Sequence, residues 1–167
     1  MRRIAAHSIV GIYWGERLTA RQHALRHGWR LAQVVANPTK QELMELKARE
    51  QRLGALTSGV PISSCGVGAR NGSAYCFSLF AEELKAALGS AMLPRHVAYI
   101  DGEDPTLSSW CRFVNHAADG SVACNLVPRV NALRCLVWLE ATRDIEAGEE
   151  LAFSYGDTYK WDAPPSS

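Results

Sequence analysis

The sequence predicts a single α+β domain made mainly of strands, with short helices. A chain of 167 residues, 47% of them hydrophobic, can close one compact core and leaves little for a second. Helical periodicity occurs before residue 90, whereas the rest consists of short apolar runs separated by Asp, Gly and Pro. No apolar run approaches the roughly 20 residues that cross a bilayer. The net charge of +1 offers no strong field to nucleic acid, so we expect neither a membrane nor a nucleic-acid partner.

The first elements alternate between strand and helix. Ile9–Trp14 is an apolar run that predicts a strand. Thr19 suits the N-cap of a short helix over Thr19–Arg26. Leu31–Ala36 predicts another strand, which Pro38 interrupts.

The segment from Thr39 to Gly54 carries the strongest helix signal. Thr39 and Glu42 have the spacing of a capping box, and leucines recur at helical intervals up to Gly54. The composition then turns to Gly, Ser and Pro over Leu56–Gly72, which predicts a loop. A second amphipathic pattern over Ser78–Gly89 predicts another helix.

Five short apolar runs predict the strands of the second half: His96–Ile100, Cys111–Val114, Val122–Val127, Leu133–Ala141 and Leu151–Tyr155. Residues 163–167 are rich in Pro and Ser and predict a disordered tail. The five cysteines are odd in number and never form a C-x-x-C pair. This argues against a disulfide framework and a zinc site, and favours buried thiols in a reducing compartment.

Four segments in a fixed order carry chemical information beyond this outline. They are Tyr75-Cys76-Phe77-Ser78-Leu79, Tyr99-Ile100-Asp101-Gly102, Arg112-Phe113-Val114-Asn115-His116 and the ten residues from Gly148 to Asp157. Together they resemble the SET domain, the fold of protein-lysine methyltransferases that use S-adenosylmethionine. The resemblance implies one domain over residues 1–162, with a variable insertion at 19–72. It also implies several small curved sheets around a pseudoknot-like crossing.

The resemblance assigns roles position by position. Tyr155 corresponds to the tyrosine whose hydroxyl lies beside the transferred methyl group and the target nitrogen, so it is the expected catalytic residue. Asn115 and His116 correspond to the pair that contacts the cofactor, S-adenosylmethionine. Tyr75 and Trp161 are further cofactor-binding candidates, although the spacing before Trp161 is one residue longer than in the family pattern.

The resemblance also places Phe153 and Tyr99 in the substrate channel. A narrow, water-poor channel favours loss of the proton from a lysine, whose free side chain has a pKa of ~10.4. In-line transfer then needs the amine about 3 to 3.5 Å from the methyl carbon. The implied partner is a protein or peptide that presents a lysine, with histone tails the most familiar class. The implied location is intracellular, reducing and nuclear.

Each site residue also has a purely structural interpretation. Tyr155 ends an apolar strand and suits a place in the core. Asn115 and His116 suit an ordinary turn, and Arg112 suits bracing of that turn. No second ligand supports His116 as a metal site, so we expect no metal.

Three departures from the family pattern favour a second hypothesis, a catalytically weak or inactive SET-like interaction module. No G-x-G segment precedes Ile9, so the chain is a fragment, a domain that begins inside the motif, or a variant with altered cofactor binding. The usual N-H-S-C-x-P-N is replaced by a longer loop from Asn115 to Leu126, a variant similar to PR-type relatives. No cysteine-rich zinc segment follows Asp162.

Overall fold

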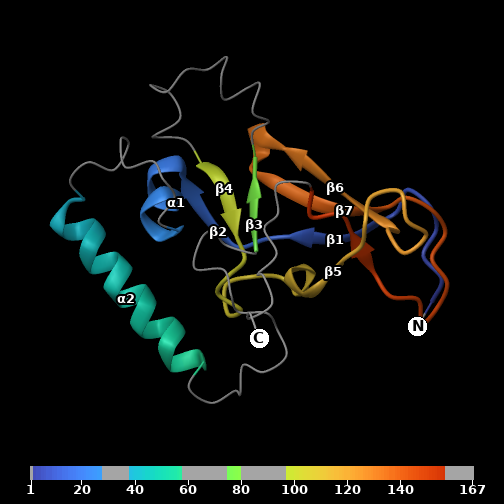
Figure 1. Ribbon diagram of the computed structural model, residues 1–167. Helices are drawn as coiled ribbons and strands as arrows, with labels where there is room; N and C mark the ends of the chain where they lie inside the picture. The colour runs from blue at the N-terminus through green and yellow to red at the C-terminus, as the bar shows by residue number, and fades with distance from the viewer. Residues whose placement is uncertain (1, 28–37, 58–74, 80–96, 157–167) are drawn as a thin grey trace, which may run out of the picture.

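The computed structural model describes residues 2–27, 38–57, 75–79 and 97–156, and the strands within these ranges form two sheets (Figure 1). The five-stranded sheet has the order β1-β7-β6-β8-β5, and the three-stranded sheet has the order β2-β4-β3. The strands are β1 (Ile9–Tyr13), β2 (Glu16–Thr19), β3 (Cys76–Ser78), β4 (Val97–Asp101), β5 (Asn115–His116), β6 (Leu126–Asn131), β7 (Leu136–Ala141) and β8 (Ala152–Phe153).

The core lies where the two sheets meet. β1, β7 and β6 pair antiparallel, and along β7 every second residue, namely Val137, Leu139 and Ala141, is fully buried. Ile100 of β4 and Phe153 of β8 belong to the same buried cluster. β8 pairs in parallel with both β5 and β6, so the end of the chain that follows β7 returns into the middle of the larger sheet.

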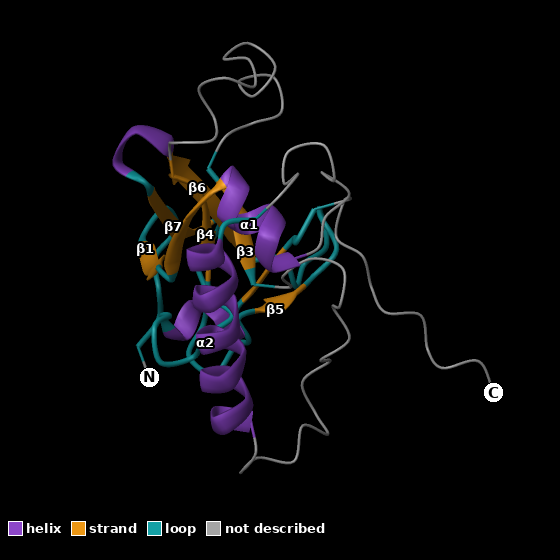
Figure 2. Cartoon of the chain, turned by 90° about the vertical axis from the view of Figure 1, so that its left-hand side faces the viewer, coloured by secondary structure: helices purple, strands orange, loops and turns teal. Residues whose placement is uncertain are grey.

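Two capped helices precede β3 in the described residues. α1 (Ala20–His27) begins after Thr19, and α2 (Lys40–Thr57) begins after Thr39. The amide of Gln22 donates to Thr19 Oγ1 and the amide of Glu42 donates to Thr39 Oγ1, each over 3.2 Å, as in a capping box. α1 lies next to β2 and β4, and α2 lies beside α1 on the same side of the molecule (Figures 1 and 2).

Several expected elements differ in the structure. The helix α2 is longer than expected and continues through Gly54 to Thr57, because one glycine costs a helix interior only about 1 kcal/mol. The expected strand Cys111–Val114 is wrong: these residues form the 3-10 helix η2 (Trp110–Phe113), in which amides donate to carbonyls three residues earlier. β2 has no counterpart among the expected strands.

The other strands expected in the second half are present with shifted boundaries. The run Val122–Val127 contributes only its last two residues to β6, and Leu133–Ala141 begins in the 3-10 helix η3 (Ala132–Arg134) before β7. The strands expected at Ile9–Trp14 and His96–Ile100 are confirmed as β1 and β4. The mainly β architecture with several sheets is confirmed as well.

Other expectations fall on residues that the structure does not describe. The helix expected over Ser78–Gly89 does not begin at Ser78, which is the last residue of β3. The structure does not describe the rest of that helix from residue 80, the strand Leu31–Ala36, the loop residues 58–72, Trp161 or the tail 163–167. Four cysteines are described, all without a disulfide; Cys111 is buried and the other three are half-buried. In the same ranges no helix is long and apolar enough to cross a membrane.

Candidate functional site

Parallel pairing of β5 with β8 brings together two motifs that lie far apart in the chain. Asn115 lies opposite Ala152, and His116 lies opposite Phe153. β8 is held on its other side by β6, so it has little freedom to shift. The Asn-His pair therefore lies beside the strand that leads into Tyr155.

Tyr155 is attached to this segment at two points. Its hydroxyl donates a hydrogen bond to the carbonyl of Val114 at 2.6 Å, and its backbone amide donates to Nδ1 of His116 at 3.1 Å. The rings of Tyr155 and His116 also meet edge to face, with centroids 5.2 Å apart. Because the hydroxyl gives its proton to a carbonyl, its oxygen retains lone pairs that can accept from another group. The structure thus brings the expected catalytic tyrosine and His116 together, and their roles stay predictions.

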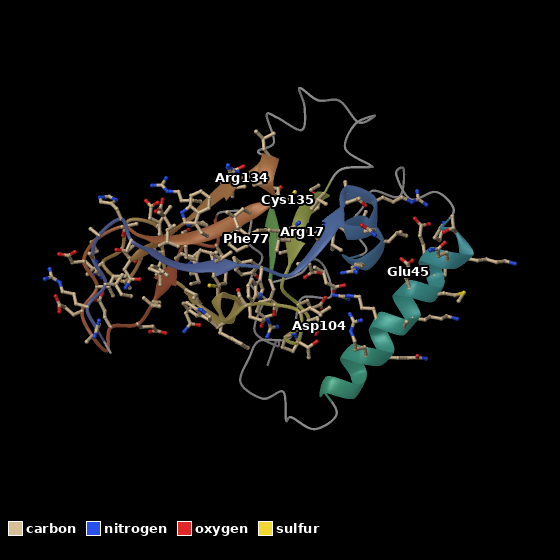
Figure 3. The ribbon with its side chains drawn as sticks, turned by 180° about the vertical axis from the view of Figure 1, so that it is seen from behind. Arg17, Glu45, Phe77, Asp104, Arg134 and Cys135 are labelled. Atoms are coloured by element: carbon tan, nitrogen blue, oxygen red, sulfur yellow. The ribbon has the colours of Figure 1, made fainter. Side chains whose placement is uncertain are left out.

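A row of aromatic rings leads from the core to Tyr155. The ring centroids are 4.6 Å apart for Tyr13 and Phe77, 5.8 Å for Phe77 and Phe153, and 4.9 Å for Phe153 and Tyr155. Phe77 is labelled in the middle of the molecule in Figure 3. Tyr155 itself packs against the buried cluster, so a packing role and a chemical role are compatible. Apolar rings packed against Tyr155 disfavour the charged form of an amine placed next to them.

An open pocket of about 640 Å³ lies next to the Asn-His pair. Its lining consists of Asn115, His116, Ala117, Val122, Ala123, Arg143, Glu149, Glu150 and Ala152. A hydrogen bond from Arg143, and a second from Asn125, lower the pKa of Glu149 to about 2, so this side chain is a carboxylate at neutral pH. The amide of Asn115 donates to the carboxylate of Glu150. Among the described residues, no group of three or more His, Cys, Asp or Glu side chains could hold a metal ion.

Asn125 is a structural residue of the site that sequence reasoning missed. It is fully buried, and its side chain donates to the carbonyl of Glu150 at 2.7 Å and accepts from the amide of Ala152 at 3.0 Å. It therefore fixes the loop before β6 against the start of β8. The only signal in the sequence is a polar residue directly before an apolar run, which does not reveal its burial.

Tyr75 lies directly before β3, where Arg112 and Tyr13 hold it. The guanidinium carbon of Arg112 is 4.2 Å from the centroid of the Tyr75 ring, and Nε of Arg112 donates to the carbonyl of Gly102 at 2.6 Å. The hydroxyl of Tyr13 donates to the carbonyl of Tyr75 at 2.6 Å. Burial raises the pKa of Tyr13 well above its ordinary value, so Tyr13 remains a donor. Arg112 thus braces the loop after β4.

Tyr99 lies on the other face of the smaller sheet. Its neighbour Ile100 is buried in the core, so strand alternation turns Tyr99 away from the core. The Tyr99 ring stacks on His23 of α1, with centroids 3.9 Å apart. The structure therefore does not bring Tyr99 to Tyr155, and its channel role stays a prediction. Trp161 lies outside the described residues.

Comparison with known families identifies this arrangement. A model of the SET domain matches residues 1–156, which is nearly the whole chain. The chain belongs to the SET domain family. The two small sheets and the parallel pairs of β8 are thus the SET fold as this sequence builds it.

Three known proteins are similar to this chain. It is 31% identical over 83 residues to the histone-lysine N-methyltransferase EZH2 of Chaetomium thermophilum, a match over 48% of this chain and 5% of that protein. The Neurospora SET domain protein DIM-5, a histone lysine methyltransferase, matches with a TM-score of 0.50 and 22% identity over 99% of this chain and 50% of that one. The methyltransferase domain of human PR domain-containing protein 2 matches with a TM-score of 0.45 and 17% identity, over 99% of this chain and 69% of that one. The chain therefore spans a small part of the EZH2 relative and half of the DIM-5 chain, whose likeness supports the fold.

Proposed function

We propose that this SET domain is an S-adenosylmethionine-dependent protein-lysine N-methyltransferase that acts on histone tails. The observation that carries the proposal is the double attachment of Tyr155 to the segment Val114–His116, beside an open pocket. The name of the Chaetomium relative, a histone-lysine N-methyltransferase, supports the same reaction class. An intracellular, reducing, nuclear location belongs to the proposal and has the same support.

The residues present fit the proposed cofactor in size and in charge. The pocket of about 640 Å³ falls within the roughly 300–1,000 Å³ of small-molecule sites. Asn115 and His116 are the residues proposed to hold the cofactor, with Tyr75 as a further candidate. Arg143 compensates the charge of Glu149, so the carboxylate of Glu150 is the group of the lining that complements a positively charged ligand. When bound, S-adenosylmethionine supplies a methyl group on a positively charged sulfur.

Tyr155 is the proposed catalytic residue. Its hydroxyl donates to the Val114 carbonyl, so its oxygen can accept from the polarised C–H bonds of a methyl group or orient the target amine. The ring of Phe153 packs against the ring of Tyr155, with Phe77 next to Phe153, and such an apolar neighbourhood favours the neutral amine that in-line transfer needs. These effects orient and desolvate the amine, and positioning is most of the catalysis that the protein supplies.

Two variants separate binding from chemistry. Asn115→Ala is expected to weaken binding of S-adenosylhomocysteine about tenfold or more, because it removes a polar contact of the pocket; calorimetry on the full chain measures this. Tyr155→Phe is expected to lower kcat by about a hundredfold or more and to leave the Kd of S-adenosylhomocysteine within about twofold. Mass spectrometry on a mixture of histone-tail peptides measures the transfer.

Tyr99→Phe is the matched control, because it removes a phenol oxygen just as Tyr155→Phe does. Because Tyr99 stacks on His23, Tyr99→Phe is expected to retain transfer, and that result would remove Tyr99 from the proposed channel. Full transfer by Tyr155→Phe would show that the reaction is centred elsewhere.

A catalytically weak or inactive interaction module is the second candidate function. It is favoured by the loop from Asn115 to Leu126, which replaces the N-H-S-C-x-P-N of active relatives with a longer and different sequence. Folded protein that gives no heat with S-adenosylhomocysteine would support the module, whereas saturable binding would support the enzyme.

A further inference from the structure

The imidazole of His116 holds the backbone of Tyr155. The amide of Tyr155 donates to Nδ1 of His116 over 3.1 Å, and the two rings meet edge to face at 5.2 Å. A ring nitrogen that accepts a hydrogen bond carries no proton, and in the imidazolium form both ring nitrogens are donors. This geometry therefore requires the neutral ring, with its proton on Nε2.

The hydrogen bond between the Tyr155 amide and His116 attaches the chain after β8 to β5, beyond the last backbone hydrogen bond between these strands. The last residue pair between β5 and β8 is His116 with Phe153. The amide of Ala117 then donates to the carbonyl of Phe153 at 3.1 Å. Tyr155 follows two residues later. Gly156 then takes a φ of 86°, so the chain turns directly after Tyr155. His116 thus anchors the last residue before the turn.

We infer that His116 is a positioning residue for Tyr155 and that uptake of a proton at Nδ1 moves the Tyr155 hydroxyl out of its place. The effect on methyl transfer rests on the proposed function, whereas the hydrogen bond does not. A protonated ring turns a donor toward the donating amide of Tyr155, so the two repel each other. The bond between the Tyr155 hydroxyl and the Val114 carbonyl, made by the same residue, then loses its alignment.

Among the described residues, ionisable groups near His116 come from three segments: the one after β7, the one before β8 and the one after β8. Tyr155 comes from the segment after β8, and Arg143, Glu149 and Glu150 line the same pocket as His116. Arg143 is paired with Glu149, and Glu150 accepts a hydrogen bond from the other residue of β5. The loop after β5 contributes only uncharged residues to the lining. A proton on His116 therefore adds charge to a pocket whose ion pair is already formed.

Methyl transfer measured against pH tests this role. His116→Asn carries an amide oxygen near the position of Nδ1 and cannot gain a proton, whereas His116→Gln carries its oxygen one bond further, near Nε2. As the pH is lowered, kcat of the wild type is expected to fall about fivefold or more relative to His116→Asn, because only the imidazole can gain a proton at this position. At about pH 8, His116→Gln is expected to be about fivefold slower than His116→Asn. Ratios between variants cancel the titration of the substrate lysine.

His7→Asn is the matched control. His7 is an exposed histidine with a φ of 63°, a left-handed conformation that asparagine tolerates, so the variant is expected to fold and to follow the pH profile of the wild type. Equal kcat for His116→Asn and His116→Gln at every pH, or parallel pH profiles for His116→Asn and the wild type, would overturn the inference.

A second measurement does not depend on activity. In nuclear magnetic resonance spectra of the cofactor-free full chain, the amide signal of Tyr155 is expected to titrate together with the ring of His116 in the wild type and to lose this titration in His116→Asn. If the amide signal of Tyr155 does not change while the His116 ring gains its proton, the inference is wrong even in an active enzyme. If the folded wild type transfers no methyl group, the proposed function is wrong. The amide titration would still test whether His116 positions Tyr155.

Discussion

Two side chains from outside β8 provide partners for the backbone around Tyr155. Asn125 accepts from the amide of Ala152 and donates to the carbonyl of Glu150, and His116 accepts from the amide of Tyr155. β8 has only two residues, so side chains make hydrogen bonds that a longer strand would make with its neighbours. The position of the Tyr155 hydroxyl therefore depends on residues that are distant in sequence.

Replacing Asn125 tests this dependence. Asn125→Ala leaves the amide of Ala152 and the carbonyl of Glu150 without these partners, and it is expected to lower the free energy of unfolding by about 2–4 kcal/mol. Urea denaturation measures the loss. Asn131→Ala is the matched control, because it removes one hydrogen bond to the amide of Arg134 at an exposed turn and is expected to cost about 1 kcal/mol or less. Equal losses for both variants would contradict the role of Asn125.

Glu42 connects the two helices. Its carboxylate accepts from the amide of Thr39 at 2.7 Å, which caps α2, and from Nε of Arg21 in α1 at 2.6 Å. The hydrogen bond from Arg21, followed by that from Thr39, lowers the pKa of Glu42 to about 2. The same charge therefore stabilises the start of α2 and its contact with α1.

Acid is expected to loosen the start of α2. The pKa of Glu42 is lower in the folded chain than its ordinary value of 4.5, so its stabilising contribution is complete above that pH and is lost as the pH falls toward about 2. Amide-exchange protection of Leu43 and Met44 should fall over this interval in the wild type. Glu42→Gln should show weaker protection at neutral pH and little further change with acid. The control Glu45→Gln, on the same helix, should keep the acid transition of the wild type; its loss there would contradict the assignment to Glu42.

A cluster of charged side chains connects α2 with the smaller sheet and so joins the helical side of the molecule to the rest. Nη2 of Arg49 lies 2.5 Å from Glu103 and 3.4 Å from Asp101, and Nε of Arg52 lies 2.8 Å from Asp104. Asp104 is labelled in the segment that faces α2 in Figure 3. The side chains of Asp101 and Asp104 are fully buried, so the arginines replace the water that these carboxylates lose on folding.

Removal of one of these arginines is expected to weaken the whole molecule. Arg49→Met leaves the buried charge of Asp101 with weaker compensation, and breaking a buried pair costs about 3–5 kcal/mol of unfolding free energy. Lys47→Met removes an exposed charge from the same helix and is expected to stay within about 0.5 kcal/mol of the wild type. Thermal and urea unfolding measure both. A small and equal effect of the two variants would show that α2 is held by other contacts.

Features that depend on neighbours in sequence could be predicted. The caps at Thr19 and Thr39 each lie three residues from their partners, so both helix starts were correctly expected. β2 could not be predicted, because Leu18 is its only buried residue and its pairing with β4 is what makes it a strand. Burial of Asn125 and the side of the sheet that Tyr99 faces also depend on distant strands.

The residue types of the site can be recognised from the sequence alone, because Asn115-His116 and Tyr155 lie in motifs that do not depend on the surrounding structure. Their meeting is a property of the folded molecule: the atoms that join them belong to residues 39 positions apart. Hydrogen bonds between distant strands depend on register, and a shift of one residue would turn every side chain of a strand to the opposite face. No local pattern encodes that register, so the contact between His116 and Tyr155 arises from the packing of β8 between β5 and β6.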